Sequence, residues 1–390
     1  MKSNLQKLIK KKLGLFILFL LPLVSFAQSV LQGSVINEVD GKPLPDASVF
    51  LNNTTLGSKT NAEGKFRISG IPSGQYELIV SLIGFKSYNQ VVTIDRNTEI
   101  NGVKMTPTVT LMNEVTVSGS DKYRSRKLRM FKEQFLGASG FSNDCEISNP
   151  EILVLKFQNH QQVLTGYSND FLEIENKATG YKIKYLLNNF KLDKIALNIS
   201  YEGYAFFEEL KGDPKQKELW EKHRRAIYYG SPTHFLRVVT AGKADSDFVV
   251  RPFCIKKIDT LDNPVYKSML DIRLGNSAKY YMLRYDTLTT SKYVHPTSNR
   301  GVYAISYPYD LDVFYFPPGV PHSLDAYHEH GNRGQIGSFD FINSNIFFDY
   351  NGRILNPDGV SLRYRWGRDR VAELLPLGYN PPLREQTAKR

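Results

Sequence analysis

The stretch GSVINEVDGKPLPDASVFLNNTTLGSKTNAEGKFRISGIPSGQYELIVSLIGFKSY, residues 33–88, decides the fold of the N-terminal part of the chain. Turn residues interrupt it at roughly eight- to twelve-residue intervals, at Asp40-Gly41, residues 61–64, residues 72–74 and Gly84. Between these turns apolar residues recur at every second position, as in Tyr76, Leu78 and Val80. Side chains two apart on a strand share a face, so the pattern predicts a β-sandwich of short strands over residues 30–117.

Several short motifs in this stretch resemble those of the carboxypeptidase regulatory-like domain. They are Gly33-Ser34-Val35, residues 41–45, residues 47–50, residues 60–66, residues 71–76 and Gly84-Phe85. The resemblance implies a transthyretin-like sandwich of about seven strands without catalytic residues. It also implies an outer-membrane setting, because this module begins many Bacteroidetes outer-membrane proteins. In relatives with a TonB-dependent barrel, a segment like residues 111–119 leads into a plug, and this chain departs from that pattern after Gly119.

The first 27 residues have the pattern of a secretory signal peptide. Lys7, Lys10, Lys11 and Lys12 precede an apolar run at residues 13–24, and Ser25-Phe26-Ala27 follows it. The apolar run is shorter than the roughly 20 residues that a membrane-spanning helix needs. We therefore expect cleavage after Ala27 and export of the mature chain to the periplasm or outer membrane, in soluble or peripheral form.

Charge and cysteine content narrow the class of partner. The formal net charge of +11 includes five lysines of the leader, and 45 basic against 39 acidic residues leave +6 on the mature chain. This small excess argues against a nucleic-acid partner. Cys145 and Cys254 are the only cysteines, and in an oxidising compartment they are candidates for a disulfide or for two small buried side chains.

The sandwich is followed by a basic segment and a second domain. Residues 119–134 carry Lys122, Arg124 and Arg126 among other cations, with Leu128 and Phe131 between them. This segment is expected to be a linker, or an amphipathic helix packing on the next domain, in preference to a contact with anionic lipid. We place the sandwich at residues 28–118 and an α+β domain with a largely antiparallel sheet at residues 135–390.

Periodicity predicts individual elements of the second domain. Residues 183–201 alternate as a half-buried strand, and residues 279–285 and 301–316 are rich in Tyr, Phe and Val. Residues 214–229 have helical spacing with Asp213 as N-cap and Pro214 at the first position, and a short helix is expected after Ser231-Pro232. Residues 369–375 are expected to form a closing helix that Pro376 stops.

The second domain also resembles a family, one without an assigned activity. The segments that carry the resemblance are FLGASGFSNDCEISNPEIL at residue 135, LEIENKATGYKIKYLL at 172, YEGYAFFEEL at 201, YYGSPTHFLR at 228 and WGRDRVAELLPLGYNP at 366. The family is an uncharacterised one of Bacteroidetes, in which this domain follows a regulatory-like sandwich. The resemblance implies an architecture and a location and no chemistry.

Catalytic motifs are missing from the sequence. It has no nucleophile elbow, phosphate-binding loop, paired Cys-x-x-Cys or His-Glu-x-x-His. Its densest cluster of ligating residues is at 321–330, where His322, His328 and His330 occur with two carboxylates. On a strand, His328 and His330 would share a face and form half of a zinc site, whereas a polar surface loop needs no metal. Zinc is accordingly the only cofactor considered.

A second histidine pair, His223 and His234, flanks Arg224-Arg225 and the turn at residues 228–233. The group could bind an anion near a helix end, but a histidine on a helix face more often packs and hydrogen-bonds. Ser231 lacks a neighbouring base that could activate it as a nucleophile. We favour structural roles for these residues.

Two hypotheses of function follow. The first is an exported, non-catalytic protein of the cell envelope whose sandwich is a docking or binding module for an envelope protein or glycan. The second is a metal-dependent envelope hydrolase that uses the cluster from His322 to His330. The missing catalytic motifs favour the first.

Overall fold

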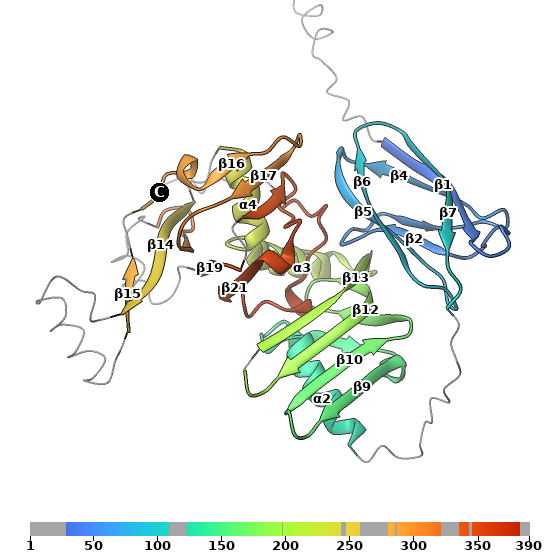
Figure 1. Cartoon of the computed structure of the whole chain (residues 1–390), viewed down its shortest axis with the longest axis horizontal. Coiled ribbons are helices and arrows are strands. Elements are labelled where there is room, and N and C mark those ends of the chain that lie inside the picture. Colours follow the sequence, from blue (N-terminus) through green and yellow to red (C-terminus); the bar gives the residue numbers. More distant parts are fainter. Residues whose placement is uncertain are drawn as a thin grey trace, which may run out of the picture.

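A computed structural model describes residues 29–108, 123–196, 198–242, 247–257, 280–284, 287–320, 335–342 and 345–382. Within these residues the chain forms a β-sandwich, a six-stranded sheet and a five-stranded sheet with a small sheet beside it (Figure 1). All pairings except that of β1 with β7 are antiparallel within the named sheets. The predicted fold class, a sandwich followed by a largely antiparallel α+β body, is confirmed.

The sandwich has seven strands in two sheets. One sheet has the order β4-β1-β7 and the other β3-β2-β5-β6. The strands are β1 (Ser29–Asn37), β2 (Ser48–Leu51), β3 (Gly57–Lys59), β4 (Lys65–Ile71), β5 (Gly74–Ser81), β6 (Tyr88–Ile94) and β7 (Thr98–Met105). The alternating positions Tyr76, Leu78 and Val80 are all buried in an aliphatic core, as the sequence pattern predicts.

The six-stranded sheet is built around one long hairpin. Its strands are β8 (Cys145–Ile147), β9 (Leu153–Gln158), β10 (Val163–Ser168), β11 (Phe171–Asn176), β12 (Tyr181–Asp193) and β13 (Asn198–Glu209). β12 pairs with β10 and β11 along one edge and with β13 along the other. The prediction of one strand over residues 183–201 was wrong, because a turn after Asp193 separates β12 from β13. Asp193 accepts two backbone N–H bonds there and so stabilises the turn.

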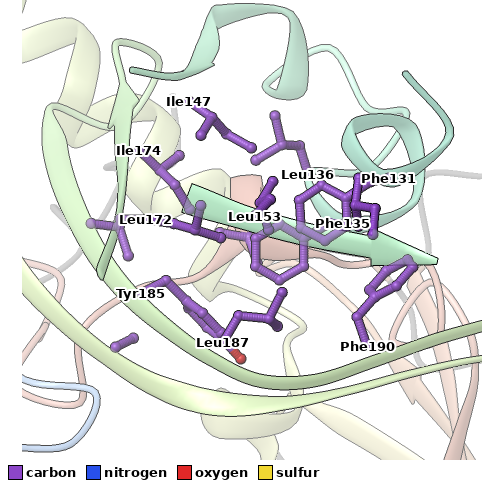
Figure 2. Close-up of a cluster of buried hydrophobic side chains, with 14 of the residues drawn as sticks. Phe131, Phe135, Leu136, Ile147, Leu153, Leu172, Ile174, Tyr185, Leu187 and Phe190 are labelled. Carbon is purple, nitrogen blue, oxygen red and sulfur yellow. The ribbon is translucent and has the colours of Figure 1, made fainter. Parts of the chain in front are cut away.

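Helix α2 (Arg124–Phe135) covers one face of this sheet. It lies within the basic segment that the sequence analysis expected to be a linker or a packing helix. Phe131 and Phe135 are fully buried and make edge-to-face contacts with Phe190 and Tyr185 of β12 (Figure 2). Arg124 donates hydrogen bonds to the carbonyls of Pro150 and Glu151, and to that of Leu153 at the start of β9. The helix therefore packs as part of the same unit as the six-stranded sheet. We call the sheet and this helix the second body.

The third body combines two sheets. The five-stranded sheet has the order β15-β14-β18-β19-β21, and the small sheet has the order β16-β17-β20. The strands are β14 (Phe248–Lys257), β15 (Tyr280–Arg284), β16 (Val294–Pro296), β17 (Val302–Ile305), β18 (Asp310–Tyr315), β19 (Gln335–Phe341), β20 (Ile346–Asp349) and β21 (Val360–Tyr364). Its core is aromatic, with Phe235, Phe339 and Trp366 in mutual contact.

Two helices join the second and third bodies. α3 (Pro214–Tyr228) starts at a capping box between Asp213 and Gln216, and α4 (Pro232–Thr240) starts at the N-cap Ser231. Both starts are as predicted. Gly230 separates the helices in a left-handed conformation, with φ of +81°. Within the described residues, the other helical pieces are single 3₁₀ turns: η1 (Ser142–Asp144), η2 (Pro150–Ile152), η5 (Thr290–Lys292), η6 (Pro357–Gly359) and η7 (Val371–Glu373).

The predicted closing helix at residues 369–375 is replaced by η7 alone. After η7 the chain runs on without helix or strand through residue 382. Tertiary contacts replace the lost helical bonds: the Ala372 N–H donates to Leu136, and the Ala372 carbonyl accepts from Asn176. The described helices include none that is long and apolar enough to cross a membrane.

Candidate functional site

A cavity of about 240 Å³ lies where the second and third bodies meet. Its walls come from four segments far apart in sequence: β13, the α3–α4 junction, the turn after β21, and residues 373–379. Tyr201, Tyr228 and Trp366 contribute aromatic walls, while Arg237 and Asp369 contribute charge. Ligand sites commonly occur at such boundaries between bodies. We call this cavity the cleft.

The α3–α4 junction wall is held by Trp366 and Arg365. The indole N–H of Trp366 donates to the Gly230 carbonyl at 2.7 Å. The Arg365 guanidinium donates to the carbonyls of Ala226, Ile227 and Tyr229, each at 3.0 Å. These carbonyls end α3 without intrahelical partners, so one cation satisfies the helix terminus. Burial lowers the pKa of Arg365.

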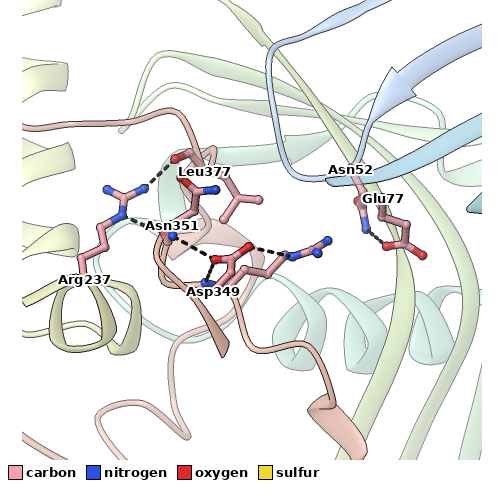
Figure 3. A network of polar contacts seen from close by, with 7 residues as sticks. Asn52, Glu77, Arg237, Asp349, Asn351 and Leu377 are labelled. Carbon is pink, nitrogen blue, oxygen red and sulfur yellow. Dashed lines mark hydrogen bonds and ion pairs between the residues drawn. The ribbon is translucent and has the colours of Figure 1, made fainter. Parts of the chain in front are cut away.

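Residues 374–380, which we call the strap, form another wall of the cleft. Arg237 of α4 donates to the carbonyls of Leu377 at 2.5 Å and Tyr379 at 2.8 Å, and to that of Asn351 at 2.8 Å (Figure 3). The Tyr379 hydroxyl donates to Glu221 of α3 at 2.9 Å. The strap is thus bonded to both helices, and Arg237 also bonds to the third body at Asn351.

Two carboxylates lie at the base of the cleft. Burial raises the pKa of Asp369 to about 6, and the nearby Arg365 opposes this shift. Glu373 Oε2 accepts from the Arg370 N–H at 2.9 Å, whereas its buried Oε1 has no hydrogen-bond partner. Within the described part of the chain, no group of three or more His, Cys, Asp or Glu side chains is placed to hold a metal ion. The cleft is suited to hydrogen bonding and apolar contact.

The sandwich reaches the cleft region through the turn after β2. The Asn53 N–H donates to the Ala205 carbonyl at 2.8 Å, and the Phe207 N–H donates to the Thr54 carbonyl at 3.0 Å, which adds a short parallel bridge to β13. Asn52 fixes this turn, because its side chain donates to Glu77 and accepts from the Ala205 N–H (Figure 3).

Phe50 and Gly74 complete the contact of the sandwich with the rest of the chain. The Phe50 ring lies 5.7 Å from that of Phe171 and 5.5 Å from that of Phe206. Gly74 is absent from the positive-φ glycines of the described residues. Its role is steric, since a Cβ there would lie 2.9 Å from Asn351 Nδ2 and Tyr350 OH.

The predicted zinc ligands His322, His328 and His330 lie outside the described residues, so the half-site stays a prediction. Cys145 has a free thiol, which donates to the Phe141 carbonyl at 3.5 Å, and burial raises its pKa to about 12. The side chain of Cys254 is not among those described. The Cys145–Cys254 disulfide therefore also stays a prediction.

The histidines near the helix junction have structural partners. His223 Nδ1 lies 2.8 Å from the Ala178 carbonyl, and Arg224 donates to the Thr179 carbonyl at 2.7 Å. His234 Nδ1 accepts from the Gly230 N–H at 3.1 Å. Ser231 is the N-cap of α4 and accepts from the His234 N–H. These contacts agree with the structural roles that the sequence favoured.

Sequence reasoning missed the cleft residues themselves, although it quoted the segments that contain them. Residues 228–237 and 366–381 were singled out only for a family resemblance, and the structure brings them together across the cleft. A signal was present in the occurrence of Trp366, Arg370 and Tyr379 within one short segment. Without the fold, that clustering does not indicate which residues face one another.

Two packed sheets of three and four strands define residues 29–108 as a β-sandwich module carried by a larger antiparallel body. Residues 31–117 match the CarboxypepD_reg-like domain family, so the predicted domain is confirmed. The match covers less than a quarter of the chain and assigns nothing to the body that holds the cleft.

Several solved structures align with about a fifth of the chain. A type II cohesin–X-dockerin complex from Acetivibrio cellulolyticus aligns at 16% identity over 20% of this chain and 56% of its own, with a TM-score of 0.19. The minor pilin of Streptococcus agalactiae aligns at 17% identity over 22% and 47%, with a TM-score of 0.18.

Catechol 1,2-dioxygenase from an Acinetobacter species aligns at 13% identity over 22% of this chain and 54% of its own, with a TM-score of 0.18. The chain therefore spans about half the length of these structures. Likenesses this weak carry no functional argument. No curated protein sequence matches the chain.

Proposed function

We propose that the protein is an exported, non-catalytic binding protein of the cell envelope, located in the periplasm or at the outer membrane. The cleft is the ligand site, and the sandwich is a docking module joined to it. The cleft carries the proposal, because it combines aromatic walls with Arg237 and Asp369 at the boundary between two bodies. The partner is an envelope protein or glycan.

Binding is favoured over catalysis by how the polar groups at the cleft are engaged. Ser231 caps α4, and Arg237 donates to backbone carbonyls, so neither is free to act on a substrate. A nucleophile needs a base within hydrogen-bond reach, and Ser231 contacts the His234 backbone instead of its imidazole. The Ser231 cap holds the start of the α4 wall in place, as a preorganised binding site requires.

The sandwich supports the proposal as the module that fixes the cleft within the chain. Its turn at Asn53 and Thr54 pairs with β13, the strand that contributes Tyr201 to the cleft. Asn53 also accepts a hydrogen bond from the strap at Leu377. A partner held by the sandwich would therefore be brought close to the cleft.

Thr233→Trp tests the cleft in the mature chain. Thr233 lies on the fixed α4 wall and is half-buried, so an indole there would fill the cavity. The matched control is Thr287→Trp at an exposed position. Co-sedimentation is measured with isolated cell envelopes, protease-treated envelopes and purified peptidoglycan. We expect Thr233→Trp to weaken binding at least tenfold and the control to leave it unchanged.

The three preparations distinguish a protein partner from a glycan. Binding lost after protease treatment identifies a protein partner, and retained binding to peptidoglycan identifies a glycan. A folded wild-type chain that sediments with none of the three preparations would contradict the proposed function. Export is checked by the intact mass of the secreted chain, which should begin at Gln28; a mass that includes Met1 would overturn the predicted cleavage.

A further inference from the structure

The strap is an uncharged peptide segment that lies in a groove formed by the rest of the chain, and the Tyr379 N–H closes a turn in it by donating to the Pro376 carbonyl at 2.9 Å. Its sequence is Leu-Leu-Pro-Leu-Gly-Tyr-Asn, and it has neither helix nor strand. Loop residue Asn53, helix α3, helix α4 and strand β13 surround it. The strap therefore shows what kind of ligand this groove accommodates.

The groove binds the backbone of the strap on both sides. The Leu377 N–H donates to the Asn53 carbonyl at 2.7 Å, and the Leu377 and Tyr379 carbonyls accept from Arg237. These three bonds involve only backbone groups of the strap, so they do not depend directly on its side chains. Any peptide that adopts the same turn could make the same three bonds.

Side-chain contacts select for apolar and aromatic residues. Tyr379 is only 8% exposed, and its ring lies 5.8 Å from that of Tyr228. Leu374 and Leu375 pack against the core of the second body. The strap carries no charge, which suits a site where Arg237 already has carbonyl partners.

The strap fills the groove incompletely. The cavity of about 240 Å³ remains beside Leu375, Leu377 and Tyr379. A ligand that made the same backbone bonds and also filled this space would gain contacts that the strap lacks. The strap is thus a replaceable occupant.

We infer that the groove between the sandwich turn, α3, α4 and β13 is a binding site for an uncharged, turn-forming peptide segment of a partner protein. The strap occupies this site until the partner displaces it. This inference rests on the proposed function and names the class of ligand. Displacement would also release the bond to Asn53, so ligand binding would loosen one connection between the sandwich and the rest of the chain.

The test uses the full mature chain and a fluorescein-labelled synthetic peptide with the sequence of residues 372–382. The double variant Leu375→Ser/Tyr379→Ser removes the side-chain anchors of the strap and leaves Arg237 and Asn53 unchanged. By fluorescence anisotropy, we expect the variant to bind the peptide at least tenfold more tightly than the wild type. A scrambled peptide is the matched control, and adding Arg237→Gln should abolish the gain.

A second measurement needs no substitution. In the wild-type chain, millimolar unlabelled peptide should accelerate hydrogen exchange at the Leu377 amide and leave the β12 amides unchanged. A folded double variant that binds the peptide no better than wild type, together with unchanged exchange at Leu377, would overturn the inference. If the peptide fails while intact envelopes still bind, the proposed function stands and the ligand is of another class.

Discussion

The sandwich and the body that holds the cleft are stabilised by contacts of different range. In the sandwich, side chains such as Asn61 and Thr60 bond to backbone groups a few to sixteen positions away, and an aliphatic core fills the space between the sheets. Around the cleft, Arg237 and Arg365 bond to carbonyls more than a hundred positions away. Local sequence patterns can therefore reveal the first region and cannot reveal the second.

The largest expected effect comes from removing a long-range arginine. Arg365→Met leaves the carbonyls of Ala226, Ile227 and Tyr229 without their donor, and we expect a loss of about 3 kcal/mol in the free energy of unfolding. The matched sandwich change, Arg67→Met, removes an exposed bond to Gln32 and should cost no more than about 0.5 kcal/mol. Urea unfolding followed by circular dichroism measures both. Equal losses of stability in the two variants would contradict the difference between the two regions.

A smaller effect is expected at Asp369, whose pKa is raised to about 6 mainly by burial. Because the folded state holds this proton more tightly than the unfolded chain does, stability should fall as pH rises from about 4 to about 6. Asp369→Asn removes this dependence and should stabilise the protein by about 2 kcal/mol at pH 7.5. The measurement is urea unfolding from pH 4 to 8. A stability difference between variant and wild type that does not change with pH would contradict it.

The smallest expected effect compares two glycines of the sandwich. Gly74→Ala places a methyl group against Asn351 and Tyr350 and should cost about 1 kcal/mol in the full chain. Gly41→Ala has open space but a φ of +69°, so its cost of about 1 kcal/mol is a backbone effect. Thermal unfolding of the full chain and of residues 28–108 separates them. In the isolated sandwich only the Gly41→Ala cost should persist.

Much of the fold was predictable from short patterns. The alternation at Tyr76, Leu78 and Val80 placed a strand face, and Asp213-Pro214 placed the start of α3. The same kind of evidence failed for residues 369–375, where helical spacing is present but the backbone bonds go to Leu136 and Asn176 instead. Tertiary hydrogen bonds there replace those of a regular helix.

The candidate site was less accessible to sequence reasoning. The segments around Tyr228 and Trp366 were recognised, but their meeting across the cleft depends on Arg237, Arg365 and the Trp366 indole. Any of the chain's many arginines could in principle have taken these positions. The zinc ligands predicted at residues 322–330 remain untested by the described residues.

The sequence by itself determined the sandwich, the capped helices and the predominance of antiparallel strands, because alternation, turn residues and caps act over a few neighbouring positions. Only the tertiary structure showed that the cleft forms, where the strap lies and that Gly74 has a steric role. These depend on pairs of groups separated by long stretches of chain. Such pairs form only when the cores on either side have brought the backbone together.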